Sequence, residues 1–227
     1  RAASECRGGA AGFGATTVLQ GVGSSGPGGS LAGIFGLNGA GKSVTLKTVA
    51  GIVPARTGQV LLDGQDITRW GPEKRVAHGM GHIPEGRRLF ARLTVEENLL
   101  LARSAGRTGA WTLDAVMEAF PNLKDRRRSL AGTLSGGGQP ATATGRALMG
   151  NPRVLLMDEP SEGLAPRIVA EVGRTIARLK QEGQSIVLVE KNVNLAVAVA
   201  DEVVMLNTGR VVVVGRVGQV RDDPAPR

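Results

Sequence analysis

The sequence predicts an α/β domain built on a mostly parallel β-sheet, and two observations lead to this expectation. After Arg153, apolar runs that suit buried strands alternate with segments of helical periodicity. A strand, a glycine turn and a helix also follow one another between Ser30 and Ala50. Because strands joined through helices pair in parallel by right-handed crossovers, these units are expected to share one sheet. The 227 residues allow one such domain with a small additional part.

Turn residues divide the first part of the chain. Residues 1–30 are rich in glycine and lack periodicity, so weak strands and turns are expected there. Residues 30–36 form a short apolar run, and a helix is expected over 42–50. A hairpin is expected around Asp63 and Gly64, which supply the positive φ angles of a tight turn.

The middle of the chain is helical in character, and the alternation returns at its end. Thr94 and Glu97 have the spacing of a capping box ahead of an apolar run, and Pro121 is expected to stop the later helix. After the middle section the expected elements are a strand at 153–158, a helix at 165–183, a strand at 184–190, a helix at 192–200 and a hairpin turning at 207–209.

Charge and cysteine content narrow the class of protein. A net charge of +8 suits nucleic acid, anionic lipid or phosphorylated ligands. The basic residues are scattered, and the one tight run, 124–128, is better explained as a solvated helix face than as a nucleic-acid patch. Cys6 is the only cysteine, which excludes an intrachain disulfide and a cysteine-based zinc site. No apolar run is long enough for a membrane span, and the N-terminal residues lack the apolar segment of a signal peptide.

A glycine-rich phosphate-binding motif, GLNGAGKS at 36–43, follows the first expected strand and opens the first expected helix. Its glycines allow a nest of backbone N–H donors around phosphate oxygens, and the helix N-terminus adds its dipole. Lys42 is expected to reach the β- and γ-phosphates, and the Ser43 hydroxyl to ligate Mg²⁺. The expected nucleotide contacts are Gly36, Asn38, Gly39, Ala40, Gly41, Lys42, Ser43 and Val44.

Two acidic residues end the apolar run VLLMDEP. The carboxyl ends of buried parallel strands meet at the ligand crevice of a sheet, so Asp158 is expected to hold Mg²⁺ and Glu159 to face a water molecule. Glu159 would then act as the general base for attack on a γ-phosphate, while Lys42 stabilises charge on the phosphate oxygens. A polar turn without function is the alternative explanation, and the nearby phosphate motif makes it the weaker one.

The order of GLNGAGKS, LSGGGQ and LLMDEPSEGLA resembles that of an ABC-type ATPase. The segments GHIPEGRRLFARLTVEENLLL and GRALM resemble the ATP-binding subunits of branched-chain amino-acid importers, and the resemblance runs over residues 11–223. It implies a P-loop NTPase fold with a RecA-like core, an N-terminal antiparallel β subdomain and a small α-helical subdomain. The implied single domain, 1–227, has its core and β subdomain at 1–91 and 151–227. The helical subdomain with the signature motif would cover 92–150.

The same resemblance implies a site shared between two subunits. In the family, two ATPase subunits form a head-to-tail dimer that encloses two ATP molecules. Ser135, Gly136 and Gly137 would contact ATP bound by the neighbouring subunit, and Phe13 would stack on adenine. Glu85 would contact Mg²⁺ or water and relay to a membrane subunit. The loop 161–165 would cross the dimer interface.

The chain departs from the family pattern at a few positions. Lys191 stands where most members have histidine and related ones have glutamine, and two readings stay open: contact with a γ-phosphate, or a side chain pointing into solvent. Val44 replaces a usual threonine, with an expected modest loss of nucleotide affinity. Gly138 and Pro140 alter the signature. Residues 134–150 have the composition of a linker, yet a helix from about 138 to 149 is expected, because proline is tolerated in a first helical turn.

The leading hypothesis is a Mg²⁺-dependent ATPase subunit of an importer for branched-chain amino acids or a similar solute, with Glu159, Lys42 and Lys191 as catalytic residues. Its expected partners are a second ABC ATPase subunit, identical or different, membrane permeases and, indirectly, a solute-binding protein. It is expected to lie in the cytoplasm, on the inner face of the membrane. A rival hypothesis is a nucleotide-binding module with little hydrolysis, and a third is an ABC ATPase acting on nucleic acid, which the chain's single ATPase domain disfavours. His78 and His82, the two histidines, are expected to be structural or solvated.

Overall fold

The protein is described by a computed structural model that covers residues 2–7, 19–23, 29–56, 58–105, 107–134 and 136–217. The strands are β1 (Ala2–Arg7), β2 (Leu19–Gly23), β3 (Leu31–Gly36), β4 (Gln59–Leu62), β5 (Gln65–Asp66), β6 (Met80–Ile83), β7 (Val154–Asp158), β8 (Ser185–Glu190), β9 (Glu202–Asn207) and β10 (Arg210–Arg216). The helices are α1 (Lys42–Val49), α2 (Pro72–Ala77), α3 (Val95–Leu100), α4 (Leu113–Ala119), α5 (Pro121–Lys124), α6 (Gly138–Leu148), α7 (Pro166–Gln181) and α8 (Val193–Val199).

The central sheet confirms the predicted parallel architecture. Its strands lie in the order β10-β9-β3-β8-β7-β6, in which β9 to β6 run parallel and β10 runs antiparallel at one edge. The elements expected after Arg153 all form, in the expected order. This arrangement places the carboxyl ends of β3 and β7, where the two chemical motifs begin, at the same edge of the sheet.

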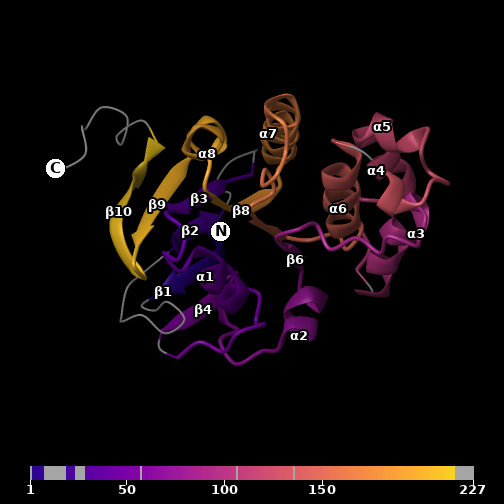
Figure 1. The fold of residues 1–227 in the computed structure, drawn as a ribbon. Coiled ribbons are helices and arrows are strands. Elements are labelled where there is room, and N and C mark those ends of the chain that lie inside the picture. Colours follow the sequence, from indigo (N-terminus) through magenta and orange to yellow (C-terminus); the bar gives the residue numbers. More distant parts are fainter. Residues whose placement is uncertain are drawn as a thin grey trace.

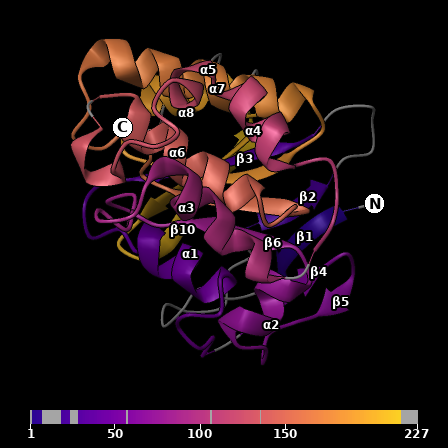
Figure 2. The same cartoon turned by 90° about the vertical axis from the view of Figure 1, so that its right-hand side faces the viewer.

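The central sheet is buried on both faces, which explains the apolar character of its strands. Side chains alternate along β3, so that Leu31 and Phe35 belong to one apolar cluster and Ala32 and Ile34 to the other. The first cluster packs under α7 and α8, and the second packs under α1 and β4. Figures 1 and 2 show α7 and α8 on one side of the sheet and α1 on the other.

A smaller antiparallel sheet, ordered β2-β1-β4-β5, lies on the α1 side (Figure 2). The predicted hairpin between β4 and β5 forms, with φ angles of 51° at Asp63 and 80° at Gly64. The weak strands expected in the first thirty residues are β1 and β2. The turns expected at 8–18 and 24–28 lie outside the described residues.

Helices α3 to α6 gather beyond the β6 end of the central sheet (Figure 1). The predicted capping box at the start of α3 forms, since the Thr94 hydroxyl accepts from the Glu97 backbone and the Glu97 carboxylate accepts from the Thr94 backbone. Pro121 ends the helical run at Ala119, as expected, and also begins α5, because proline fits a first helical position.

The segment with linker composition is a helix entrance. Gly136 has a φ of 47°, α6 begins at Gly138, and Pro140 lies buried in its first turn. Helix α2 and strand β6, in contrast, were not among the elements expected from the sequence. Among the described residues, no helix combines the length and the apolar composition needed to cross a lipid bilayer.

Candidate functional site: a phosphate-binding loop facing two buried acids

The phosphate-binding loop connects the end of β3 to the start of α1. Gly39 and Gly41 take φ angles of 78° and 95°, which glycine adopts without strain. Gly209 donates a backbone hydrogen bond of 3.0 Å to the Ala40 carbonyl and so ties the loop to the β9–β10 turn. The ammonium group of Lys42 is buried and donates to the carbonyl of Gly36 at 2.8 Å. The loop therefore holds a shielded cation at the N-terminus of a helix, the usual setting for binding a phosphate.

Asp158 ends β7 directly opposite the first turn of α1. The Ser43 hydroxyl donates to Asp158 Oδ1 at 3.0 Å. Burial raises the pKa of the Asp158 carboxyl, against the lowering effect of that hydrogen bond. Among the described residues, no hydrogen-bond partner reaches its buried Oδ2 atom. A buried carboxylate oxygen with free acceptor capacity beside a hydroxyl matches the donors that Mg²⁺ prefers.

Glu159 follows Asp158 and turns its side chain toward the loop. Its φ of 47° is unusual for a residue other than glycine, and its backbone N–H donates to the Val189 carbonyl at 2.9 Å. The carboxylate is 4% exposed and lies 3.7 Å from Lys42 Nζ. Strained backbone of this kind is often found where a side chain is held for function.

Lys191 follows β8 and is directed into the site rather than away into solvent. Its Nζ atom lies 2.6 Å from Glu159 Oε2 and 2.8 Å from Glu162 Oε1. These contacts, first with Glu159 and then with Glu162, raise the pKa of the Lys191 ammonium group above its ordinary value. Lys191 is therefore cationic and paired with the expected general base.

Glu85 joins this acidic group from the loop after β6. One carboxylate oxygen from each of Glu85, Glu159 and Glu162 lies within 4.8 Å of the others. Hydrogen bonding to Glu162, and then its charge, raise the pKa of Glu85. A cavity of about 340 Å³ brings most of the expected residues together, lined by Asn38, Gly39, Gly41, Lys42, Ser43, Val44, Glu85, Glu159 and Lys191.

The signature glycines are not part of this cavity, although Gly137 lines a second cavity that also reaches Glu159. Gly136 and Gly137 precede α6, where a Cβ atom at either position would meet Ile168 of α7, and neither lines the cavity at the phosphate-binding loop. Phe13 and Ser135 lie outside the described residues. Within one chain, the described part of the site is therefore assembled without the signature.

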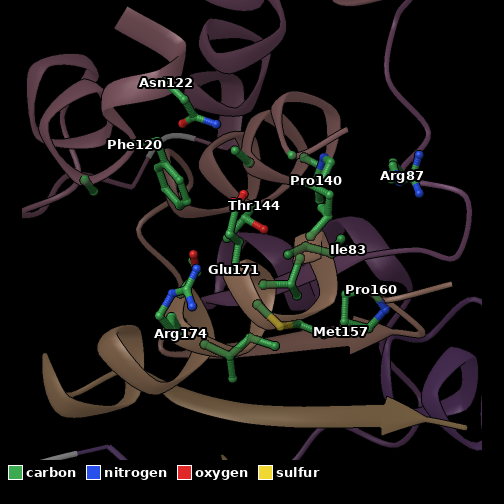
Figure 3. Close-up of a pocket in the computed structure, with 18 of the residues that line it drawn as sticks. Ile83, Arg87, Phe120, Asn122, Pro140, Thr144, Met157, Pro160, Glu171 and Arg174 are labelled. Carbon is green, nitrogen blue, oxygen red and sulfur yellow. The ribbon is translucent and has the colours of Figure 1, made fainter. Parts of the chain in front are cut away.

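A second cavity, of about 400 Å³, lies between α6 and α7 and is also lined by Glu159 and Glu162. Figure 3 shows Pro140 and Thr144 on one wall, Glu171 and Arg174 on another, and Met157 at the base. No motif predicted this space, because its walls come from segments far apart in the sequence.

Arg87 is a further residue that sequence reasoning missed. Its guanidinium group donates to the Glu162 carbonyl and to Gln139 Oε1, both at 3.1 Å. Arg146 of α6 in turn donates to the Arg87 carbonyl at 3.2 Å. Arg87 therefore connects the loop after β6 both to the turn after β7 and to α6. No local pattern marks an arginine whose acceptors lie this far away in sequence.

Comparison with known proteins gives the site its family. The sequence profile of the ABC transporter family matches residues 11–162. The chain belongs to this family. Members of the ABC transporter family bind and hydrolyse ATP, so the chain is an ABC ATPase.

Two relatives of this ABC ATPase differ in the transport system that they serve. The high-affinity branched-chain amino acid transport ATP-binding protein BraG of Pseudomonas aeruginosa is 41% identical over 192 residues, which cover 81% of this chain and 80% of BraG. The lipopolysaccharide export system ATP-binding protein LptB of Haemophilus influenzae is 32% identical over 201 residues, or 85% of this chain and 82% of LptB.

A solved structure supports the fold of this ABC ATPase. A nucleotide-free ATP-binding cassette from an ABC transporter superposes with a TM-score of 0.78 at 26% identity. The superposition covers 99% of this chain and 96% of the other. The predicted P-loop NTPase fold and the resemblance to importer ATPases are both confirmed by these comparisons.

Proposed function

We propose that this ABC ATPase drives the uptake of branched-chain amino acids, or of a similar small solute, through membrane permeases. Its higher identity to BraG than to LptB favours amino-acid import over lipopolysaccharide export. The observation that supports the chemistry is the placement of the Ser43–Asp158 pair and Glu159 around the phosphate-binding loop, which is the proposed ATP-binding loop.

Each residue of the site has a defined role in this proposal. The backbone N–H groups of residues 36–44 and the Lys42 ammonium group bind the phosphates of ATP. Ser43 and Asp158 hold Mg²⁺, which supplies charge neutralisation at the phosphate oxygens. Glu159 accepts the proton of the attacking water, and Glu85 orients that water at the mouth of the site.

The proposed assembly is a dimer of ATPase subunits, made of two copies of this chain or of this chain and a related one. Ser135, Gly136 and Gly137 of one subunit would complete the site of the other, Phe13 would stack on adenine, and the loop 161–165 would cross the interface. Residues 92–150 form the proposed helical subdomain, and residues 1–91 and 151–227 the core with its β subdomain. Permeases would hold the dimer at the cytoplasmic face of the membrane, and a solute-binding protein would deliver the solute to the permeases. No nucleic-acid partner is proposed.

One experiment tests the solute and the base together. The protein is purified from its own membrane with the permeases that accompany it, reconstituted in liposomes, and assayed for ATP-dependent leucine uptake. We expect uptake by the wild-type complex and none with Glu159→Gln, because the neutral amide cannot accept a proton, whereas binding of ATP is retained.

The matched control is Glu118→Gln, which removes an exposed carboxylate on α4 and should transport normally. Uptake that persists with Glu159→Gln would refute the proposed role of Glu159 as the general base. Copurification with lipopolysaccharide-export proteins, without any amino-acid permease, would refute the proposed solute.

A further inference from the structure

The carboxylate of Glu159 lies between two ammonium groups. Lys191 Nζ is 2.6 Å from Oε2 and Lys42 Nζ is 3.7 Å from Oε1, while only 4% of the Glu159 side chain is exposed. At these distances the two ammonium groups hold the buried carboxylate in place by ion pairing. In this arrangement the proposed base is restrained by its own surroundings.

Lys191 is anchored at its backbone, whereas its side chain is partly exposed. Its N–H donates to Glu190 Oε2 at 3.2 Å, at the buried end of β8, and Asn192 immediately caps α8. The side chain, in contrast, is 40% exposed and holds a second carboxylate, Glu162, at 2.8 Å. The ammonium group can therefore change partners without movement of the strand or of the helix.

The same ammonium group lines the cavity at the ATP-binding loop, together with Lys42 and Ser43. A triphosphate bound by the loop would place its terminal phosphate in this cavity. Such a phosphate carries more negative charge than one carboxylate and offers several acceptor oxygens, so it competes strongly for a lysine. A diphosphate lacks this group.

We propose that Lys191 is a positioning residue that holds Glu159 in an ion pair until a terminal phosphate draws its ammonium group away and releases the base. Glu159 would then be released from Lys191 when ATP is bound, but not when ADP is bound. This inference rests on the proposed role of Glu159 as the base, and it gives a specific function to the lysine that replaces the family's usual histidine or glutamine.

A zero-length cross-link tests the exchange of partners in the wild-type chain. A water-soluble carbodiimide joins an amine to a carboxylate only where they touch, and mass spectrometry identifies the joined peptides. We expect a Lys191–Glu159 link in the free and ADP-bound protein. With a slowly hydrolysed ATP analogue, the yield of this link should fall about tenfold, which corresponds to the usual interaction energy between two groups in contact. Equal yields in all three states, or no link in any, would overturn the proposal.

Nucleotide preference provides a second readout that a purely structural lysine would not affect. Lys191→Gln should lower the affinity for the ATP analogue relative to ADP by about tenfold. This is the size expected for one charge-assisted hydrogen bond to the terminal phosphate, less the cost of breaking the Lys191–Glu159 ion pair. Lys191→Arg keeps the cation and should keep most of the preference, and Lys124→Gln, on the exposed surface of α5, should change neither affinity. An unchanged preference in Lys191→Gln would overturn the proposal.

Neither measurement depends on turnover. If Glu159→Gln retains activity, the proposed base is wrong, but the cross-link still reports whether Lys191 leaves that carboxylate. If the cross-link yield is the same in all three states while Glu159→Gln is inactive, the role of Glu159 as the base is supported and the restraint by Lys191 is refuted.

Discussion

The guanidinium group of Arg75 lies beneath the C-terminal end of α1, the helix that begins at the phosphate-binding loop. It is 2% exposed and donates to the carbonyls of Thr48 and Val49 at 2.8 and 2.6 Å. It also donates to the carbonyls of Thr68 and Trp70. The last carbonyls of a helix have no partners within the helix and carry partial negative charge, so Arg75 both satisfies and neutralises them.

Replacing Arg75 with lysine should therefore destabilise the protein although the charge is kept. A lysine presents one compact ammonium group and cannot reproduce the planar fork that reaches four carbonyls. We expect a loss of roughly 3 kcal/mol in the free energy of unfolding, typical of a broken buried polar network. Urea denaturation measures it, with Arg69→Lys on the exposed surface as the matched control. A change below about 0.5 kcal/mol, the usual size of a surface effect, would contradict this account.

At the scale of single residues, the proximity of the motif residues was predictable from the sequence, and the contacts of residues outside the motifs were not. Lys42, Ser43, Asp158 and Glu159 stand in short patterns whose residue types the chemistry requires, and the structure places them together. Arg75 has no pattern because its partners are backbone carbonyls of other segments. The position of Lys191 raised two possibilities, and only the fold shows that its ammonium group meets Glu159.

At the scale of elements, strands with strong apolar runs were predictable, and short edge elements were not. Strand β6 spans only Met80–Ile83, contains a glycine, and lies at the edge of the central sheet. With so few residues it shows neither a clear alternation nor a long apolar run. Helix α2 is similarly short, and its start at Pro72 resembles a turn in the sequence.

The half-buried histidine of β6, His82, predicts an acid-sensitive fold. Burial, and then the charge of Lys47, lower the pKa of His82 to about 4. The unfolded chain, with an ordinary histidine pKa of about 6.5, binds a proton that the folded chain excludes, so stability falls as pH drops from about 6.5 to 4. The loss from His82 should reach about 3 kcal/mol at the lower limit, and no loss is expected above pH 7.

Urea denaturation between pH 7 and 4.5 measures this effect as a difference between variants. His82→Gln should lack this part of the pH dependence, because glutamine does not titrate. His78→Gln should keep it, since the His78 ring is exposed. Identical pH dependence in the wild-type protein and His82→Gln would show that His82 is not the sensor.

At the scale of the whole molecule, the proposed head-to-tail dimer predicts complementation between inactive variants, because the signature glycines do not line the cavity at the phosphate-binding loop of their own chain. Lys42→Ala removes the loop cation, and Gly137→Asp brings a new carboxylate within reach of Glu171, where even a Cβ atom would lie 3.0 Å from its Oε2. Each homodimer should be inactive. A mixed dimer contains one site with an intact loop and an intact signature, so mixing the two variants should restore ATP hydrolysis.

The measurement is the rate of phosphate release as the ratio of the two variants is varied at constant total protein. Activity should be highest near equal amounts, where mixed dimers are most abundant. A mixture that stays inactive would show that two copies of this chain do not share sites in the proposed head-to-tail manner.

The antiparallel edge of the central sheet has a consequence for the behaviour of the protein in solution. Strand β10 pairs with β9, and no strand of the described residues covers its other edge, where Val212 and Val214 are more than half exposed. An apolar edge strand of this kind can recruit a strand from another molecule and seed aggregates. Arg210 and Arg216 stand at its two ends. Their positive charge, within a chain of net charge +8, opposes the pairing of β10 with a strand of another molecule. The solubility of the protein should therefore fall as salt screens that charge.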